Sequence, residues 1–333
     1  MKKIFILFSL VFLFLIIFIA VNNKEIYTLK LQNTNNNEQL YINTSYEENY
    51  QRTIKLDLNT SREKVLLKKN YDDYPTSTYF EESNDIYFPG KVKNGTQQLL
   101  QKNASENRIN VLTKDLNYVD FLKLNKKEKT IYIRTLVKKD DRNFHLATFD
   151  IKTGDVYIWN DKENDYSVVT FDFSPFQKNL LVVTKSIKEE FDNISNANKN
   201  NISPTAPTHT FSIYNESGTF QKEELRLNSF VKTVSLSSDG ESFLLNFKDK
   251  LEDTSKIGLY SKSKKKIDLL LEDTTDLLNI REPIFNFKNN GFYFIADDTS
   301  NTAKAYFFNL EDKTIKEIWS KKNEQPISLY LIK

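Results

Sequence analysis

The sequence predicts an all-β fold: a six-bladed β-propeller of four-stranded antiparallel blades, preceded by one N-terminal transmembrane helix. Three observations lead to it: a unit that recurs roughly every 47 residues, two strand pairs in each unit, and an apolar run at the N-terminus. The chain has 333 residues, of which 39% are hydrophobic and 13% aromatic, mostly Phe and Tyr. Such aromatic side chains suit half-buried strands.

The N-terminal segment 1–23 is predicted to be a transmembrane signal-anchor. It opens with Lys2 and Lys3, and residues 4–21 then form an almost unbroken apolar run. About 20 apolar residues cross a bilayer, whereas the apolar core of a signal peptide is about 7–15 residues long. The two lysines should stay in the cytoplasm. We therefore expect a single-pass protein of the cell membrane with residues 24–333 outside the cytoplasm; a cleaved signal peptide and a secreted protein are the alternative.

The repeat is clearest at a turn that follows an apolar-rich strand. Asp, Asn and Ser favour turns because their short side chains bond to nearby backbone. The equivalent turn positions are Asp57, Asn103, Asp150, Asn215, Ser261 and Asn309. One interval is longer than the others because it contains the polar insert 188–210. This insert is rich in Asn and carries Pro204 and Pro207, a composition that predicts a mobile loop.

A second strand pair precedes each of these hairpins. Residues 168–185 and 231–248 are the clearest copies, and 119–136, 282–297 and 77–90 are weaker ones. Each copy reads as a strand, a short polar turn and a more apolar strand. One repeat therefore holds four strands, a length that fits the known propeller repeats.

Two of these copies resemble the repeats of a known family. The stretches FSPFQKNLLVVT (173–184) and LSSDGESFLLNF (236–247), with the hairpin LATFDIKTGDVYIW (146–159), are similar to the TolB-like (WD-like) β-propeller repeats. The resemblance is divergent: Ser-Pro occurs only in the first stretch and Asp-Gly only in the second. It extends over residues 50–322 and implies a propeller.

Six hairpins imply six blades within residues 24–333. A single blade cannot bury both of its faces, whereas six blades packed around an axis can. The first blade should use either residues 25–31 or residues 39–46, and the leftover strand 326–333 should pair with it and close the ring. A β-sandwich or a two-domain β protein is the alternative.

Loops sort by face in such a ring. We call "top" the face that carries the loops entering each blade and the loops joining the two middle strands. Acidic residues recur in these loops, and the insert ends nearby. The predicted binding residues are Asp72, Asp73, Asp140, Asp141, Asp161, Glu163, Asp297, Asp298 and His209. A calcium site made from these acids and ordinary solvated turn charges are the other interpretations.

Catalytic motifs are missing from the sequence. There is no G-x-S-x-G and no H-E-x-x-H, and the absence of cysteine excludes disulfides, thiolate metal ligands and a cysteine nucleophile. A net charge of +2 gives no indication of nucleic-acid binding. We therefore expect no catalytic residues, no metal site and no cofactor, in a monomeric module that binds a protein or an envelope polymer. The alternative is a propeller-type lyase or hydrolase acting on extracellular sugars or lactones through acids such as Asp140, Glu163 and Asp297.

Overall fold

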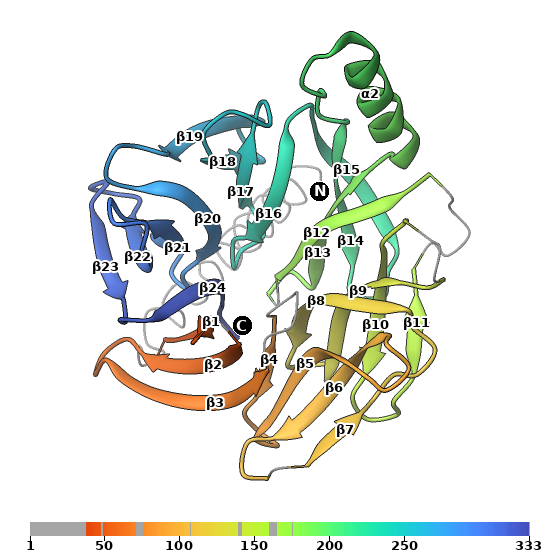
Figure 1. Ribbon diagram of the computed structural model, residues 1–333, viewed down its shortest axis with the longest axis vertical. Coiled ribbons are helices and arrows are strands. Elements are labelled where there is room, and N and C mark those ends of the chain that lie inside the picture. Colours follow the sequence, from red (N-terminus) through yellow and green to blue (C-terminus); the bar gives the residue numbers. More distant parts are fainter. Residues whose placement is uncertain are drawn as a thin grey trace, which may run out of the picture. The chain divides into compact units, whose positions relative to one another are not determined.

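The computed structural model describes residues 38–332 apart from 48, 71–75, 107, 139–141, 160–164 and 175. These residues form six separate sheets, each of four antiparallel strands, arranged around a common centre (Figure 1). The predicted all-β six-bladed propeller is therefore confirmed, and the sandwich is excluded. The predicted transmembrane segment 4–21 lies outside the described residues. Among the residues described, no helix is long and apolar enough to cross a membrane.

The blades follow chain order except at the point of closure. Blade 1 contains β24 (Glu324–Tyr330), β1 (Gln39–Tyr46), β2 (Tyr50–Asp57) and β3 (Arg62–Asn70). The others are blade 2, β4 (Thr78–Phe80), β5 (Asp85–Lys91), β6 (Gln97–Asn103) and β7 (Ile109–Val111); blade 3, β8 (Tyr118–Asn125), β9 (Thr130–Leu136), β10 (His145–Asp150) and β11 (Val156–Ile158); blade 4, β12 (Ser167–Ser174), β13 (Asn179–Lys185), β14 (His209–Asn215) and β15 (Phe220–Leu227); blade 5, β16 (Phe230–Leu236), β17 (Ser242–Lys248), β18 (Lys256–Ser261) and β19 (Lys266–Glu272); and blade 6, β20 (Leu278–Phe285), β21 (Gly291–Asp297), β22 (Ala303–Asn309) and β23 (Ile315–Trp319).

All six predicted turn positions end the third strand of a blade, at the last residues of β2, β6, β10, β14, β18 and β22. The short polar side chains at these positions bond to nearby backbone groups, as the sequence predicts. Oδ1 of Asp57 accepts from the backbone N–H of Asn59 at 2.9 Å and of Thr60 at 3.0 Å. Oδ1 of Asp150 does the same for Lys152 at 2.7 Å and Thr153 at 3.1 Å. Each side chain thus completes the turn by its own hydrogen bonds.

The ring closes through the C-terminal strand. β24 pairs antiparallel with β1, which shows that residues 39–46 supply the first blade; the alternative segment 25–31 lies outside the described residues. Asn43 Nδ2 donates to Ser328 Oγ at 2.9 Å, and the rings of Tyr41 and Tyr330 stack with centroids 4.8 Å apart. Both ends of the described chain therefore share one blade.

The core lies in layers between neighbouring blades. Leu181 and Phe211 of blade 4 pack with Phe243 and Leu245 of blade 5 in one such cluster, and all four side chains are fully buried. Because each blade buries its two faces only against its neighbours, its stability depends on an intact ring.

Polar contacts also join the inner strands near the axis. Asp172 on β12 forms an ion pair with Lys123 on β8 at 3.0 Å, and its other oxygen accepts from the N–H of Leu236 on β16 at 2.8 Å. Ser235 Oγ accepts from the N–H of Phe285 on β20 at 3.1 Å. Side chains of one blade thus satisfy backbone groups of the next.

The bottom turns are linked in the same way. Ser174 Oγ donates to the carbonyl of Ser238 at 2.8 Å, and the N–H of Ser238 donates to Asn289 Oδ1 at 3.0 Å. The N–H of Phe287 donates to Glu38 Oε1 at 2.8 Å. These bonds connect blades 4, 5, 6 and 1 in order and hold the beginning of β1 at the bottom face.

The prediction of a mobile insert is wrong, because most of it is a helix. α2 (Ile187–Asn200) follows β13 and stands out at the edge of the ring (Figure 1). Ser186 caps its N-terminus by accepting from the N–H of Glu189 at 3.0 Å. Asn201 ends it in the left-handed conformation (φ 51°) with its N–H bonded to the carbonyl of Ala197. Both ends are therefore satisfied by the caps that helices prefer.

Candidate functional site

α2 is the element that departs most from the repeat, and it lies on the top face because it joins the two middle strands of blade 4. The loop that enters blade 4 fixes its first turn. Asp165 accepts from the N–H of Lys188 and from the hydroxyl of Ser186, both at 2.7 Å. The pKa of Asp165 is lowered chiefly by that backbone bond and then by Ser186, as expected for a carboxylate at a helix N-terminus.

Three large apolar side chains are exposed on α2 and just after its C-terminal end. Phe191, Ile194 and Ile202 are 45, 40 and 59% exposed. Phe191 and Ile194 are three residues apart, so they share one side of the helix. The guanidinium of Arg142, from the middle loop of blade 3, lies 5.1 Å from the centre of the Phe191 ring. We call the surface formed by Phe191, Ile194, Ile202 and Arg142 the α2 surface.

His209 lies underneath this surface rather than on it. It is only 3% exposed, and its Nδ1 lies 3.0 Å from the carbonyl of Pro207. Burial, and then the charge of Lys185, lowers the pKa of His209 to about 4. The imidazole is therefore neutral at pH 7 and helps to anchor the segment that follows α2.

Two other predicted residues lie at the middle loop of blade 6. Asp297 forms an ion pair with Arg281 at 2.9 Å and accepts from Asn279 at 3.0 Å. Asp298 organises its own loop by accepting from the N–H of Thr302 at 3.0 Å, and its pKa is lowered by such bonds, first of all by the hydroxyl of Ser300. Among the described residues, no hydrogen bond or ion pair joins either of them to His209, which belongs to blade 4.

The remaining predicted binding residues lie outside the described residues; they are Asp72, Asp73, Asp140, Asp141, Asp161 and Glu163. Their roles stay predictions. Within the described ranges, no three His, Asp or Glu side chains are grouped so that they could hold a metal ion.

A second unusual region lies where blade 6 meets the axis. β20 loses register with β21 twice, and Asn279 (φ 50°) and Glu282 (φ 53°) both have left-handed backbone conformations. Such strain persists only where the surroundings enforce it, and it is concentrated at functional sites.

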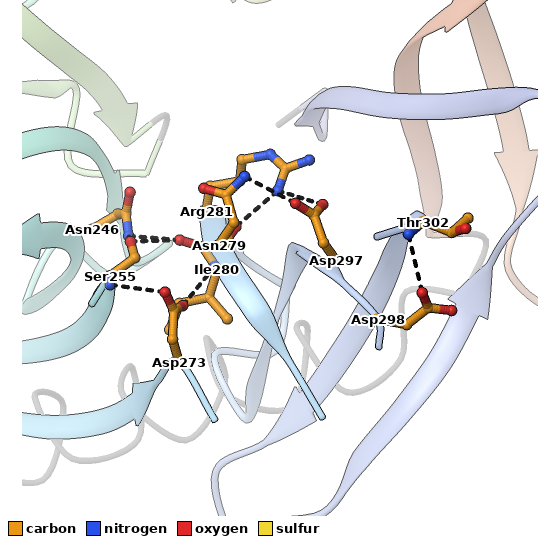
Figure 2. A network of polar contacts seen from close by, with 9 residues as sticks. All are labelled: Asn246, Ser255, Asp273, Asn279, Ile280, Arg281, Asp297, Asp298 and Thr302. Atoms are coloured by element: carbon orange, nitrogen blue, oxygen red, sulfur yellow. Dashed lines mark hydrogen bonds and ion pairs between the residues drawn. The ribbon is translucent and has the colours of Figure 1, made fainter. Parts of the chain in front are cut away.

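Figure 2 shows what enforces the strain at the start of β20. Asp273 accepts from the N–H of Ile280 at 2.9 Å and from that of Ser255 at 3.1 Å. The carbonyl of Ile280 accepts from Ser255 Oγ at 2.7 Å and from Asn246 Nδ2 at 3.1 Å. Three side chains of blade 5 and its loops thus hold the backbone N–H and carbonyl of one residue of blade 6, Ile280.

Glu282 is the carboxyl group that this distortion places at the axis. Part of the residue remains accessible, but its carboxyl group is surrounded by protein, and this burial raises its pKa to about 7. The charges of Lys123, Arg281 and Lys232 oppose the rise. These cations come from blades 3, 5 and 6, and blade 3 approaches blades 5 and 6 only near the centre of the ring.

The inner strands also line a cavity at the axis. A cavity of about 30 Å³ is lined by residues of all six inner strands and by Leu331 and Ile332 after β24. That volume holds a water molecule or two. The lining includes the paired Lys123 and Asp172 and no histidine.

The sequence did not point to Asp165, Phe191, Lys232 or Glu282. Asp165 ends the acidic stretch 161–165, whose composition does not indicate a helix as its partner. A capping pattern of Ser186 followed three residues later by Glu189 was a usable signal for α2. Glu282 has no such signal in the sequence, because its position depends on the register shifts between β20 and β21.

The ring, its repeat and its closure define the fold class: a six-bladed β-propeller. No protein-family model matches the chain. It is 27% identical over 288 residues to YdjN, an uncharacterized protein of Bacillus subtilis (strain 168), a match that covers 81% of this chain and 82% of that protein.

Solved structures share the fold. TolB from Acinetobacter baumannii has a TM-score of 0.61 at 13% identity, covering 88% of this chain and 66% of that one. A chain of a nidogen/laminin complex has a TM-score of 0.56 at 8% identity, covering 89% and 98%. Hydrazine synthase from Kuenenia stuttgartiensis has a TM-score of 0.62 at 12% identity, covering 89% and 46%. The chain thus spans about two thirds of that TolB chain and less than half of the synthase chain.

Proposed function

We propose that this protein is a membrane-anchored, extracytoplasmic binding module that captures a protein or an envelope polymer through the α2 surface. The observation that carries the proposal is a helix, inserted into an otherwise regular repeat, that presents Phe191 and Ile194 to solvent, with Ile202 exposed just after its C-cap. Helix caps, Asp165 and Arg142 hold it in place. Exposed apolar side chains on a rigid support are a common basis for recognition.

Two further facts support a binding role. A propeller of the same fold is part of a nidogen/laminin complex. That complex is a property of those proteins, and here it serves only as an example of a propeller in a protein assembly. In the present chain, the apolar run 4–21 is long enough to cross a bilayer, which would hold the ring at the outer side of a cell membrane. Without the anchor, the same ring would be secreted.

The test replaces residues 186–208 by Asp-Thr-Ser-Asn-Thr, the sequence of residues 298–302. The exchange is matched, because Lys185 pairs with His209 just as Asp297 pairs with Ala303. The ring should still fold, while crosslinking in the native cell followed by mass spectrometry should lose the partner that the unaltered protein captures.

Point variants separate the surface from the helix. The double change Phe191→Asn with Ile194→Asn should abolish capture, whereas Lys199→Gln, at an exposed position of the same helix, should not. Unchanged capture by both the loop exchange and the double variant would refute the role of the α2 surface.

An enzyme acting on sugars or lactones is the second candidate, and Glu282 is the observation that favours it. A carboxyl group with a pKa of about 7 suits general acid–base catalysis. The small axial cavity and the ion pair of Asp172 with Lys123 favour binding instead. The enzyme would be the correct function if the protein turns over a lactone or an oligosaccharide. Glu282→Gln should then abolish that turnover, and the loop exchange should preserve it.

A further inference from the structure

The outer edge of blade 5 is apolar and unpaired. β19 is the last strand of its sheet, and no strand in the described part of the chain pairs with its outer side. Leu269, Leu270 and Leu271 follow one another in it, and Leu269 is 53% exposed. A free edge presents unpaired backbone N–H and C=O groups, which makes it a template for pairing with another strand.

The other outer strands are protected against such pairing. β7 and β11 have only three residues each. β3, β15 and β23 are longer, but charged side chains stand inside them, such as Lys64, Glu223 and Lys316. Short edges and charges, lysine above all, are means by which natural proteins prevent edge-to-edge association. In β19 the charged residues stand before and after the three leucines; they are Lys266, Asp268 and Glu272.

The order of charges along β19 is complementary to that of a second copy of the same strand. When β19 pairs antiparallel with its own copy over its full length, the two-fold axis passes through Leu269. Lys266 then lies opposite Glu272 of the second copy, and Ile267 lies opposite Leu271 of the second copy. Opposite charges across an antiparallel pair stabilise it, and each pair occurs twice because such an interface is isologous.

Glu272 is available for this contact. None of the ion pairs among the described residues involves it, and its neighbour across the sheet, Lys256, binds Asp249 at 2.6 Å instead. A lysine supplied by a second copy would therefore be its first direct ion-pair partner within the described part of the chain.

Lys266 can also turn toward a second copy at little cost. It pairs with Asp268 at 2.8 Å, but the two side chains are 70 and 37% exposed, and such surface pairs contribute little. Asp268 also lies 3.9 Å from Lys264, so it keeps a cation nearby when Lys266 moves.

A bulge limits where the two strands can join. β19 holds one extra residue, Leu270, against β18. A bulge bends its strand and interrupts the ladder locally. The ladder is therefore expected between residues 266–268 of one copy and residues 270–272 of the other, on either side of the two-fold axis.

We propose that two copies of this protein associate through β19 and form a two-fold symmetric dimer, in which the sheets of the two fifth blades join edge to edge. This differs from the monomer that the sequence predicts. The interface lies on blade 5, whereas α2 belongs to blade 4, so the proposal does not rest on the proposed function. The loop exchange that removes α2 should leave the dimer unchanged.

A single cysteine tests the geometry, because the protein has none of its own. Leu269→Cys places a thiol beside its equivalent across the two-fold axis, where opposite residues are about 4.5–5.5 Å apart, within the range of a disulfide. Mild oxidation of the full chain in neutral detergent should give mostly disulfide-linked dimer on a non-reducing gel. Tyr157→Cys, at the centre of the outer strand β11 and 65% exposed, should remain mostly monomeric. Equal dimer formation by the two variants, or none by Leu269→Cys, would overturn the proposal.

Charge reversal tests the register. Glu272→Lys faces Lys266 of the second copy, so sedimentation equilibrium in density-matched detergent should show a dimer weakened by about tenfold, because two attractive cross-strand pairs become repulsive. Lys266→Glu should weaken it likewise, and the double variant Lys266→Glu with Glu272→Lys should restore it. Lys250→Glu, after β17 in the same blade, is the control and should associate like the unaltered protein. An unaltered protein that is monomeric at about 100 μM, unchanged association of Glu272→Lys, or a double variant as weak as the single ones would contradict the dimer.

Discussion

A chain that ends at Asn323, and so lacks β24, is expected not to fold. β24 is the inner strand of blade 1, and its removal leaves β1 with an unpaired edge. It also removes Leu329 and Tyr330 from the core, where they are 4 and 7% exposed. Each such side chain contributes about 1.5–3 kcal/mol, and the loss of interblade packing on both sides of blade 1 adds to this. The total approaches the stability of a typical domain, about 5–15 kcal/mol.

Thermal unfolding followed by circular dichroism measures this effect. The shortened chain should show no cooperative transition, whereas a chain ending at Ile332, which lacks only Lys333, should unfold like the complete protein. A cooperative transition of the shortened chain within a few degrees of the complete one would mean that β24 does not close the ring.

The second large effect is expected for Asp172→Ala. The carboxylate of Asp172 is nearly buried and joins three inner strands, through Lys123 on β8 and the N–H of Leu236 on β16. Its removal takes away the ion-pair partner of Lys123 and the carboxylate oxygen that accepts from the N–H of Leu236. Breaking a buried ion pair in this way costs about 3–5 kcal/mol, and we expect the lower end because Lys123 keeps some access to water.

The corresponding fall in Tm is about 6–12 °C for a domain of this size. Asp155→Ala, at an exposed turn of blade 3, is the matched control and should change Tm by little. Asp172→Asn should cost less than Asp172→Ala, because an amide oxygen can still accept from Leu236. If Asp172→Ala unfolds at the temperature of the control, the contact between the three blades contributes nothing to stability.

The turns and the closure of the ring could be predicted because their signals are local. Asp57 and Asp150 complete their turns with backbone groups only two or three residues away. The leftover strand at the C-terminus needed a partner, and only the first blade lacked a strand. Such features need no knowledge of how distant strands align.

The composition of the insert hides α2, although its local sequence pattern is that of a helix. Many Asn residues and two prolines suggested disorder, yet Ser186 begins a capping pattern and Asn201 is well placed to end a helix. Phe191 and Ile194 have helical spacing between them. The caps and the anchoring carboxylate of Asp165 outweigh the low helix propensity of Asn in this segment.

The candidate sites depended on contacts that sequence alone does not contain. Acidic loop residues were chosen for charge, but Asp297 and Asp298 serve to hold Arg281 and the loop backbone. Lys232 and Glu282 approach the axis because β16 and β20 contain bulges. A bulge is set by register between strands and by the neighbouring blade, so no single stretch of sequence reveals it.

The most direct measurement of the central claim, that the last strand pairs with the first blade, is a disulfide between Asn43→Cys and Ser328→Cys. These residues are partners in the register of β1 and β24, 285 positions apart in the chain, and their side chains are 2.9 Å from each other. The protein has no other cysteine. Mild oxidation of the folded variant should give nearly complete intramolecular crosslinking on a non-reducing gel, while a variant with Asn43→Cys and Ser195→Cys should stay uncrosslinked. Two free thiols in a folded Asn43→Cys, Ser328→Cys protein would contradict the closed ring.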